Sequence, residues 1–414
     1  MAVRPTPTRW IHAEAFALPT FRRARSRHAV YGLFLLSAGA CGSQYIAPLS
    51  PVPLIRTDAI DTRLYLIGDA GAPNPRGEPV LLALGRDLDD DPEHSLVVYL
   101  GDNVYPRGLP DSNSKKYPDA VRRLDAQVDL LVQRQVRGFM IPGNHDWDRF
   151  GPDGWNAIMR EGDHVDARGK GYIRLLPKAG CPGPVTIDRG SELRLVLVDT
   201  QWWLQSGKKP GLPGLGCPDF DETTIQEAMR VAVEGGGERH VVVLGHHPLR
   251  SGGEHGGFFD WKEHLFPLRH VKKWMWLPLP VLGSVLPLAR NLGVTSQDLS
   301  NGTNKRMVRA FGASFADMPP LVYGSGHDHG LQVLEGGVAR WMLISGAGIY
   351  SHEGPISRIK GTQLALQAAG YMRLDLLKDG RVRLGVITVD SKGFSTEVLS
   401  TWLVAESRDS LPGR

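Results

Sequence analysis

The sequence predicts an α/β sandwich of two mixed β-sheets with helices on the outside. Strand-like apolar runs alternate with helical patterns in the first half of the chain, whereas strands follow one another directly near its end. The apolar runs are nearly unbroken, as expected for strands that are covered on both faces. With 414 residues, 42% apolar and 22% charged, the chain is globular and long enough to bury a large core.

The predicted elements follow in chain order. Apolar runs predict strands near 63–68, 95–100, 138–142, 193–198, 239–244 and 320–323. Helical spacing of apolar residues predicts helices at 78–88, 118–136 and 223–234, the last of which ends at a run of three glycines. Further strands are expected at 331–335, 339–345, 371–377, 381–388 and 395–403, with hairpins over 331–345 and 371–388.

The amino terminus, residues 1–41, is expected to be an export signal. A positive stretch at Arg22–Arg27 precedes the apolar run Ala29–Ala38, which is too short to span a bilayer. Small residues end this run, and Cys41 with the following Gly-Ser is similar to a bacterial lipoprotein box. Lipidation of Cys41 and plain cleavage nearby both stay open, and a disordered tail is the alternative. Export would place the protein in the periplasm, on the outer membrane as a lipoprotein, or outside the cell.

The net charge of the chain argues against a nucleic-acid partner. The whole sequence carries a formal charge of +4, but residues 1–40 contain six Arg and one Glu, which is +5. The remainder therefore carries 4 − 5 = −1. A nearly neutral body gives no basic surface for nucleic acid.

The rest of the chain is expected to form a tether at 42–62 and one domain at 63–405, with an apolar insertion at about 271–310. No charged residue occurs from Trp274 to Ala289, and three prolines there (Pro278, Pro280 and Pro287) are expected to exclude a regular helix or a central strand. Residues 271–290 would contact a membrane surface, cover the site, or pack as a loop on the protein's own core.

Two cysteines remain once Cys41 is set aside. Cys181 and Cys217 lie in Pro- and Gly-rich loop sequence on either side of the strand expected at 193–198. An exported protein can keep a disulfide, so a bridge between them is favoured over two separate thiols.

Five short polar blocks each follow an apolar, strand-like run. Their side chains are oxygen and imidazole donors: Asp69; Asp102 and Tyr105; Asn144, His145 and Asp146; His246 and His247; and His327 and His329. Because strand ends share one edge of a sheet, we expect the blocks to form a single site. The donors suffice for two metal ions, so hydrolytic metal chemistry is the leading interpretation.

The donors divide between the two ions by charge. Asp102 is expected to bridge the ions, since its two oxygens reach both. Asp69, Tyr105 and His329 would hold one ion, and a phenol with an ordinary pKa near 10 ionises near neutral pH only beside a strongly acidic cation such as Fe(III). The second ion would be Fe(II), Zn or Mn, held by neutral donors: Asn144, His246 and His327.

The blocks resemble the motifs of the calcineurin-like metallophosphoesterases and, within them, of the purple acid phosphatases, in particular the small mammalian-type tartrate-resistant enzymes. The matching segments are Asp69–Gly71, Gly101–Tyr105, Gly143–Asp146, Gly245–His246 and Gly326–His329. Gly71 stands where the wider family has a histidine, and Tyr105 supplies the missing donor. The resemblance covers roughly 62–350 without the insertion. It implies a four-layer α/β/β/α sandwich and direct attack of a metal-bound hydroxide on a phosphate monoester, with no phosphoenzyme.

Several neighbours of the ligands are expected to assist. His145 would hydrogen-bond the substrate or protonate the leaving oxygen, and Asp146 would orient His145 or another imidazole. The resemblance makes His255 the rival proton donor, against the alternative of an exposed loop residue. His247 is expected to support the ligands, and Asp199 to be structural. Histidines outside the motifs are expected in surface or core roles: His94, His164, His240, His264, His270 and His352.

Three functional hypotheses stay open. The first is an acid phosphatase whose partner is a small phosphoester substrate. The second is a phosphodiesterase or nucleotide hydrolase on the same metals, because substrate choice depends on variable loops. The third is not an enzyme but a membrane-surface binding protein that uses residues 271–290 and holds the metals for structure.

Overall fold

The computed structural model describes residues 44–210, 217, 221–266, 268, 275–279 and 282–407. The expected export signal with Cys41, as well as His270 and part of the apolar insertion, lie outside these residues. Among the described residues, no helix is both long and apolar enough to cross a membrane.

The first sheet has seven strands in the order β15-β14-β13-β2-β3-β4-β5. Its parallel part consists of β2 (Ile60–Ile67), β3 (Ser95–Tyr99), β4 (Arg137–Met140) and β5 (Ile173–Leu175). Its antiparallel part consists of β13 (Gly370–Leu377), β14 (Val382–Val389) and β15 (Ser395–Val404). Three helices cover its outer face: α2 (Pro79–Asp90), α3 (Tyr117–Arg134) and α4 (Gly154–Arg168).

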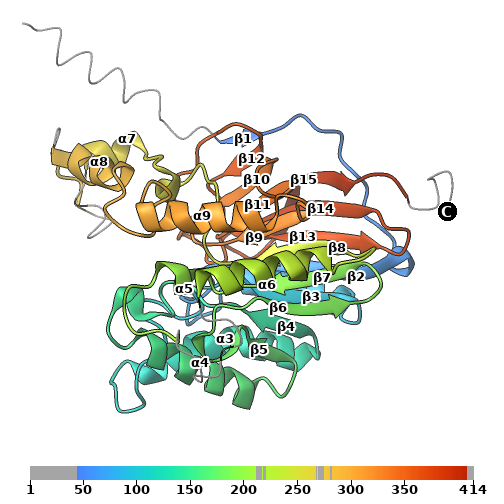
Figure 1. Ribbon diagram of the computed structural model, residues 1–414, viewed down its shortest axis with the longest axis horizontal. Helices are drawn as coiled ribbons and strands as arrows, with labels where there is room; N and C mark the ends of the chain where they lie inside the picture. The colour runs from blue at the N-terminus through green and yellow to red at the C-terminus, as the bar shows by residue number, and fades with distance from the viewer. Residues whose placement is uncertain are drawn as a thin grey trace, which may run out of the picture. The chain divides into compact units, whose positions relative to one another are not determined.

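The second sheet has eight strands in the order β1-β12-β10-β11-β9-β8-β7-β6. Four of them run parallel: β7 (Leu193–Leu197), β8 (His240–Leu244), β9 (Val322–Ser325) and β11 (Trp341–Ser345). The others pair antiparallel: β1 (Tyr45–Ile46), β6 (Val185–Arg189), β10 (Leu331–Glu335) and β12 (Thr362–Leu366). Figure 1 shows α6 (Glu222–Glu234) and α9 (Gly302–Ser314) lying over this sheet, next to α5 (Thr200–Leu204).

The two sheets pack face to face, and their central strands are buried on both sides. Leu64 and Leu66 of β2 and Leu195 of β7 enter the core between the sheets. Tyr65 of β2 packs under the helices of the first sheet, and Val196 of β7 under those of the second. Successive side chains of a strand point to opposite faces, so both sets must be apolar. The predicted class, an α/β/β/α sandwich of two mixed sheets, is confirmed.

The segment predicted as a tether is instead part of the fold where it is described. Tyr45–Ile46 pairs with β12, which makes β1 an edge strand of the second sheet. The carbonyl of Val52 accepts a hydrogen bond from the buried Arg383 guanidinium at 2.9 Å. Specific partners for the backbone hold this segment in place, although its sequence carries no periodic pattern.

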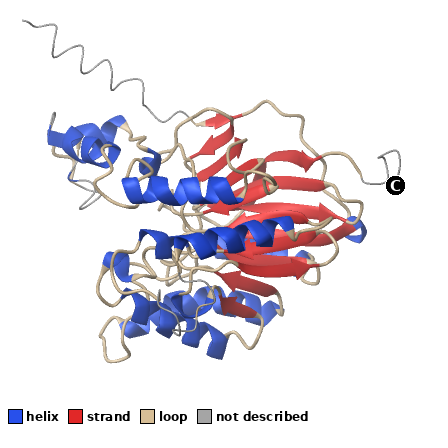
Figure 2. Ribbon diagram, viewed as in Figure 1, coloured by secondary structure: helices blue, strands red, loops and turns tan. Residues whose placement is uncertain are grey.

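The insertion contains a helix in spite of its prolines. α8 (Val285–Asn291) includes Pro287, contrary to the prediction. Pro287 lies in the first turn, where a backbone N–H has no partner within the helix, so its missing donor costs no hydrogen bond. α7 (Trp261–Leu265), η7 (Leu282–Ser284) and α8 pack on one another. Figure 2 shows this helical lobe at the margin of the molecule.

The structure pairs Cys181 with Cys217 in a disulfide, with an S–S distance of 2.06 Å. The bridge joins segments that precede and follow β7 in the sequence.

Candidate metal centre

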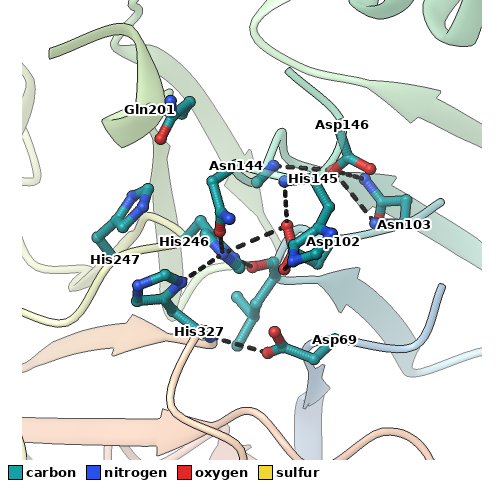
Figure 3. A network of polar contacts seen from close by, with 12 residues as sticks. Asp69, Asp102, Asn103, Asn144, His145, Asp146, Gln201, His246, His247 and His327 are labelled. Carbon is teal, nitrogen blue, oxygen red and sulfur yellow. Dashed lines mark hydrogen bonds and ion pairs between the residues drawn. The ribbon is translucent and has the colours of Figure 1, made fainter. Parts of the chain in front are cut away.

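The polar blocks converge because they end parallel strands of both sheets. Asp69, Asp102 and Asn144 follow β2, β3 and β4, which are neighbours in the first sheet. His246 and His327 follow β8 and β9, which are neighbours in the second. Figure 3 shows these side chains meeting at one place. The parallel strands of the two stacked sheets therefore present their carboxyl ends to a common site.

Glycines before the ligands let the strand ends come together. A Cβ at Gly143 would lie 2.3 Å from Oδ1 of Asp102, and a Cβ at Gly101 would lie 2.6 Å from Nδ1 of His246. Gly101 also has a φ of +89°, which favours glycine. The space that a side chain would fill at these two positions is taken by the candidate ligands themselves.

Three candidate ligands have a strained backbone. Asp69, Asp102 and His327 have φ values of 59°, 55° and 71°, in the left-handed region that non-glycine residues rarely adopt. Such conformations cost on the order of 1 kcal/mol or more each and concentrate at functional sites. Three such conformations at strand ends that meet indicate that the fold holds these side chains in position at a cost in local stability.

The first group of donors consists of Asp69, Tyr105 and His329. The Tyr105 hydroxyl lies 3.1 Å from Oδ1 of Asp69 and 3.2 Å from Nε2 of His329, and these last two atoms are 3.3 Å apart. Burial and the carboxylates of Asp102 and Asp69 raise the pKa of the Tyr105 phenol well above 10. Only a strongly acidic cation would hold this phenol ionised near neutral pH.

The second group consists of Asn144, His246 and His327, with Asp102 beside it. Nε2 of His246 lies 3.0 Å from Oδ1 of Asn144, 3.1 Å from Nδ1 of His327 and 3.5 Å from Oδ1 of Asp102. Burial and the neighbouring histidines hold the pKa of His327 well below its usual range, so this ring is a neutral donor.

The two groups fit a pair of cations with Asp102 between them. Donor atoms of Asp69, Asp102 and His246 all lie within 4.8 Å of one another, which joins the first group to the second. Burial alone would raise the pKa of Asp102, but the imidazoles of His145 and His246 lower it to about 2, so the carboxylate is ionised. Nδ1 of His327 faces the other donors of the second group, 3.1 Å from Nε2 of His246, and is the nitrogen that a cation there would engage.

His247 also lies near the second group but is occupied elsewhere. His246, His247 and His327 offer ligand atoms within 4.8 Å of one another. However, Nδ1 of His247 lies 2.8 Å from the Thr200 hydroxyl and Nε2 lies 2.7 Å from Oε1 of Gln297. With both ring nitrogens engaged, His247 is better suited to support the site than to bind an ion.

The role predicted for Asp146 needs correction. Its carboxylate accepts backbone N–H bonds from Gly143, Asn103 and Val104 at 2.8–3.1 Å, as well as the Asn103 amide. None of the hydrogen bonds found for Asp146 in the described part of the chain goes to an imidazole. Asp146 ties together the loops after β3 and β4 because these loops turn their amides toward it (Figure 3).

His145 takes its orientation from a backbone carbonyl instead. Nδ1 of His145 lies 2.8 Å from the carbonyl oxygen of Pro106, and Nε2 lies 3.8 Å from Oδ2 of Asp102. The ring packs on Tyr105, with 4.3 Å between the centroids. His145 therefore borders the site, with Nε2 on the side of the candidate bridging carboxylate.

The structure brings further residues to the site that the motifs did not indicate. The ring of His352 lies 4.3 Å from that of His329 and 5.3 Å from that of Tyr105, which places it beside the first group of donors. Arg290 lies 2.9 Å from Nδ1 of His255, whose own ring is 3.8 Å from that of His327. No local sequence signal marks His352 or Arg290.

Asp199 has the structural role that was expected. Its carboxylate caps α5 by accepting the Trp202 N–H at 3.0 Å and also accepts the Trp147 indole N–H at 2.9 Å. It belongs to neither group of donors.

Metal binding should release protons, and its affinity should rise with pH. Burial lowers the pKa of His329, but the hydrogen bond and charge of Asp69 raise it more, to about 9. The pKa of Tyr105 is higher still. Both groups are therefore protonated at neutral pH in protein stripped of metal, and an ion must displace these protons. Calorimetric titration in buffers of different ionisation enthalpy should count about two released protons per protein near pH 7.

The Tyr105→Phe variant supplies the check on this count. It should release one proton fewer, because phenylalanine has none to lose. An affinity that stays constant from about pH 6 to 8 would contradict the assignment, since the proton competition at His329 would then be absent.

Comparison with known proteins gives the family. A family model described as calcineurin-like phosphoesterase matches residues 62–276, more than half of the chain. Comparison with curated proteins found no match.

Several solved structures are similar to this chain, including the three that follow. GAP50, described as the anchor in the inner membrane complex of Plasmodium, is 14% identical with a TM-score of 0.47, covering 84% of this chain and 90% of its own. PhoD is 9% identical with a TM-score of 0.45, covering 86% and 70%. The NAD nucleotidase of Haemophilus influenzae is 11% identical with a TM-score of 0.32, covering 82% and 49%.

Proposed function

The chain belongs to the calcineurin-like phosphoesterases, and from that premise we propose that it is a phosphate monoester hydrolase of the purple acid phosphatase type. Its cofactor would be Fe(III) paired with Fe(II), Zn or Mn. The Fe(III) would be held by Asp69, Tyr105 and His329. The second ion would be held by Asn144, His246 and His327, and Asp102 would bind both ions.

The observation that carries this proposal is the Tyr105 phenol within the first group of donors. A Cβ at Gly71 would lie 2.4 Å from backbone atoms of Asp102 and Asn103, so no side chain fits there. The Gly71 carbonyl instead accepts the Tyr105 N–H at 3.0 Å. Backbone packing thus excludes a ligand at position 71 and fixes the chain that carries Tyr105, which favours a phenolate donor over an imidazole.

The protein's residues would bind and orient the substrate. When bound, the two ions would lower the pKa of a coordinated water and neutralise the phosphate charge. Asp102 stays ionised in mild acid, because its pKa of about 2 lies below that range. His145 lies beside Asp102 and His255 lies beside His327, and both would contact the phosphoester oxygens.

Turnover of two synthetic substrates tests the choice between ester classes. The metal-loaded protein should hydrolyse p-nitrophenyl phosphate with kcat/KM at least about tenfold above that for bis(p-nitrophenyl) phosphate. A preference for the diester would instead support the phosphodiesterase hypothesis. Metal-loaded protein that hydrolyses neither ester would support a binding role.

We also propose that the protein is exported and that it uses its helical lobe to contact a membrane and so reach phosphoesters linked to lipid. Seven large apolar side chains of the lobe and the residues after it are each more than half exposed: Trp261, Trp276, Leu277, Val285, Leu288, Leu292 and Val294. Lys262 lies 5.9 Å from the Trp261 ring, a pairing suited to the interface between lipid and water. Arg290 of the same lobe contacts His255, which links this surface to the site.

Vesicle sedimentation tests the membrane contact. Trp276→Ser combined with Leu288→Ser should weaken binding to anionic vesicles by more than about tenfold, because two apolar side chains that would insert into the membrane are lost. Val231→Ser combined with Phe394→Ser is the matched control, since these side chains are 55% and 64% exposed on other elements. Equal vesicle binding by the two double variants would refute the membrane proposal and would leave the phosphatase proposal unaffected.

A further inference from the structure

We infer that the inserted segment completes the catalytic site by positioning His255, an inference that rests on the proposed phosphatase function. His255 lies in η5 (Glu254–Gly256), and its ring packs against that of His327 with 3.8 Å between the centroids. Its backbone N–H donates to Oδ1 of Asp328 at 3.1 Å. The backbone is thus tied to the block that follows β9, and the ring borders the metal centre.

Two side chains of the insertion contact the same ring nitrogen of His255. Nη2 of Arg290 lies 2.9 Å from Nδ1, and Oδ1 of Asp298 lies 3.3 Å from it. Of these two contacts, only the one with Arg290 is a hydrogen bond among the described residues. A guanidinium has no acceptor, so Nδ1 accepts from Arg290, and the single proton of the neutral ring sits on Nε2. Arg290 therefore selects the tautomer in which Nε2 is a hydrogen-bond donor.

Arg290 and Asp298 are held firmly enough to act in this way. Arg290 donates from Nε to Oδ1 of Asp298 at 3.1 Å and from Nη1 to Oε2 of Glu254 at 2.9 Å. Asp298 is 1% exposed and accepts the Thr295 hydroxyl at 2.9 Å. Because two carboxylates already neutralise the guanidinium, Arg290 is suited to orient His255 rather than to bind a phosphate anion.

The same segment also contacts a second histidine beside the site. Oε1 of Gln297 lies 2.7 Å from Nε2 of His247, and the Gln297 amide donates to Oε1 of Gln201 at 3.1 Å. The Leu299 N–H donates to the His255 carbonyl at 2.9 Å. The insertion thus contacts both His247 and His255, which lie beside the candidate ligands, and is part of the site.

The contrast with His145 assigns different tasks to the two flanking histidines. Nδ1 of His145 faces the Pro106 carbonyl, which only accepts, so the proton of the neutral ring sits on Nδ1 and Nε2 is a lone pair. His255 is the one whose Nε2–H can donate to the oxygen that leaves. When the P–O bond breaks with its electron pair on that oxygen, this hydrogen bond stabilises the charge.

The Arg290→Gln and Asp298→Asn variants test Arg290 and Asp298 as positioning residues. Each should lower kcat for phenyl phosphate about tenfold with little change in KM, because the poor leaving group needs the hydrogen bond. With 2,4-dinitrophenyl phosphate the loss should be less than about twofold, since that leaving oxygen needs little stabilisation. Arg290→Lys, which keeps a charged donor, should restore part of the activity. In a His255→Ala background, Arg290→Gln should have no further effect.

The tautomer of His255 gives a readout that does not depend on activity. Nitrogen-15 NMR of histidine-labelled protein should find Nδ1 unprotonated in the wild type and partly protonated in Arg290→Gln. The control is Asn301→Ala, which removes a cap of α9 and a 2.7 Å bond to the Gly293 carbonyl without touching His255. It should leave the leaving-group dependence unchanged.

Three results would overturn the inference: equal losses on both substrates, the same pattern in Asn301→Ala, or a wild-type His255 protonated on Nδ1. A wild type that hydrolyses no monoester would overturn the proposed function instead, and the tautomer would still decide this inference.

Discussion

Asp102→Asn is expected to abolish activity, with kcat/KM falling by at least about 10³-fold. Asp102 is 1% exposed, and its Oδ1 accepts the His145 N–H at 2.8 Å while lying 3.5 Å from Nε2 of His246. Asparagine keeps the shape but loses the negative charge, and its NH₂ group cannot act as a second oxygen ligand. Elemental analysis should accordingly find fewer than two bound ions per protein, and turnover of p-nitrophenyl phosphate should fall with them.

Asp199→Asn is the matched control for this loss. Asp199 is also a buried carboxyl group at the end of a strand, but it caps α5 and binds Trp147. Burial raises the pKa of Asp199 to about 7, so losing the charge is a mild change there, and the loss of one of its two accepted N–H bonds should lower stability rather than metal binding. We expect this variant to keep its metal content and most of its activity. Full metal loading and normal turnover in Asp102→Asn would refute the bridging role.

Tyr105→Phe is expected to remove the visible colour of the iron-loaded protein completely. The colour would come from charge transfer between a tyrosinate and Fe(III), and phenylalanine offers no oxygen for it. In the structure, burial and the carboxylates of Asp102 and Asp69 raise the pKa of Tyr105 well above 10, so the phenolate forms only beside a strongly acidic ion. The optical spectrum of the wild type should therefore show a band that the variant lacks at equal iron content.

Tyr323→Phe separates this effect from the loss of any buried phenol. Tyr323 is fully buried, and its hydroxyl donates to the His247 carbonyl at 2.7 Å rather than facing the donor groups. We expect this variant to keep the band. A spectrum that is unchanged in Tyr105→Phe would show that the Fe–Tyr assignment is wrong, even if the protein still hydrolyses phosphoesters.

Much of the fold was predictable because its signals are local. The strands that carry Asp69, Asp102 and His246 are unbroken apolar runs, and these runs record burial on both faces of a sheet. The missed elements have weaker local patterns. α4 and α9 begin at glycines, and the two residues of β1 are too few to show a period.

The sequence by itself determined the fold class and the kinds of donor at the strand ends, because both depend on side-chain chemistry and on neighbours along the chain. Only the tertiary structure decided how the site is completed. Arg290 lies 35 residues from His255, and Gln297 lies 50 residues from His247. Asp146 likewise bonds amides of a loop about 40 residues away rather than an imidazole. Contacts over such separations depend on how packed elements meet, and no local pattern of residues records them.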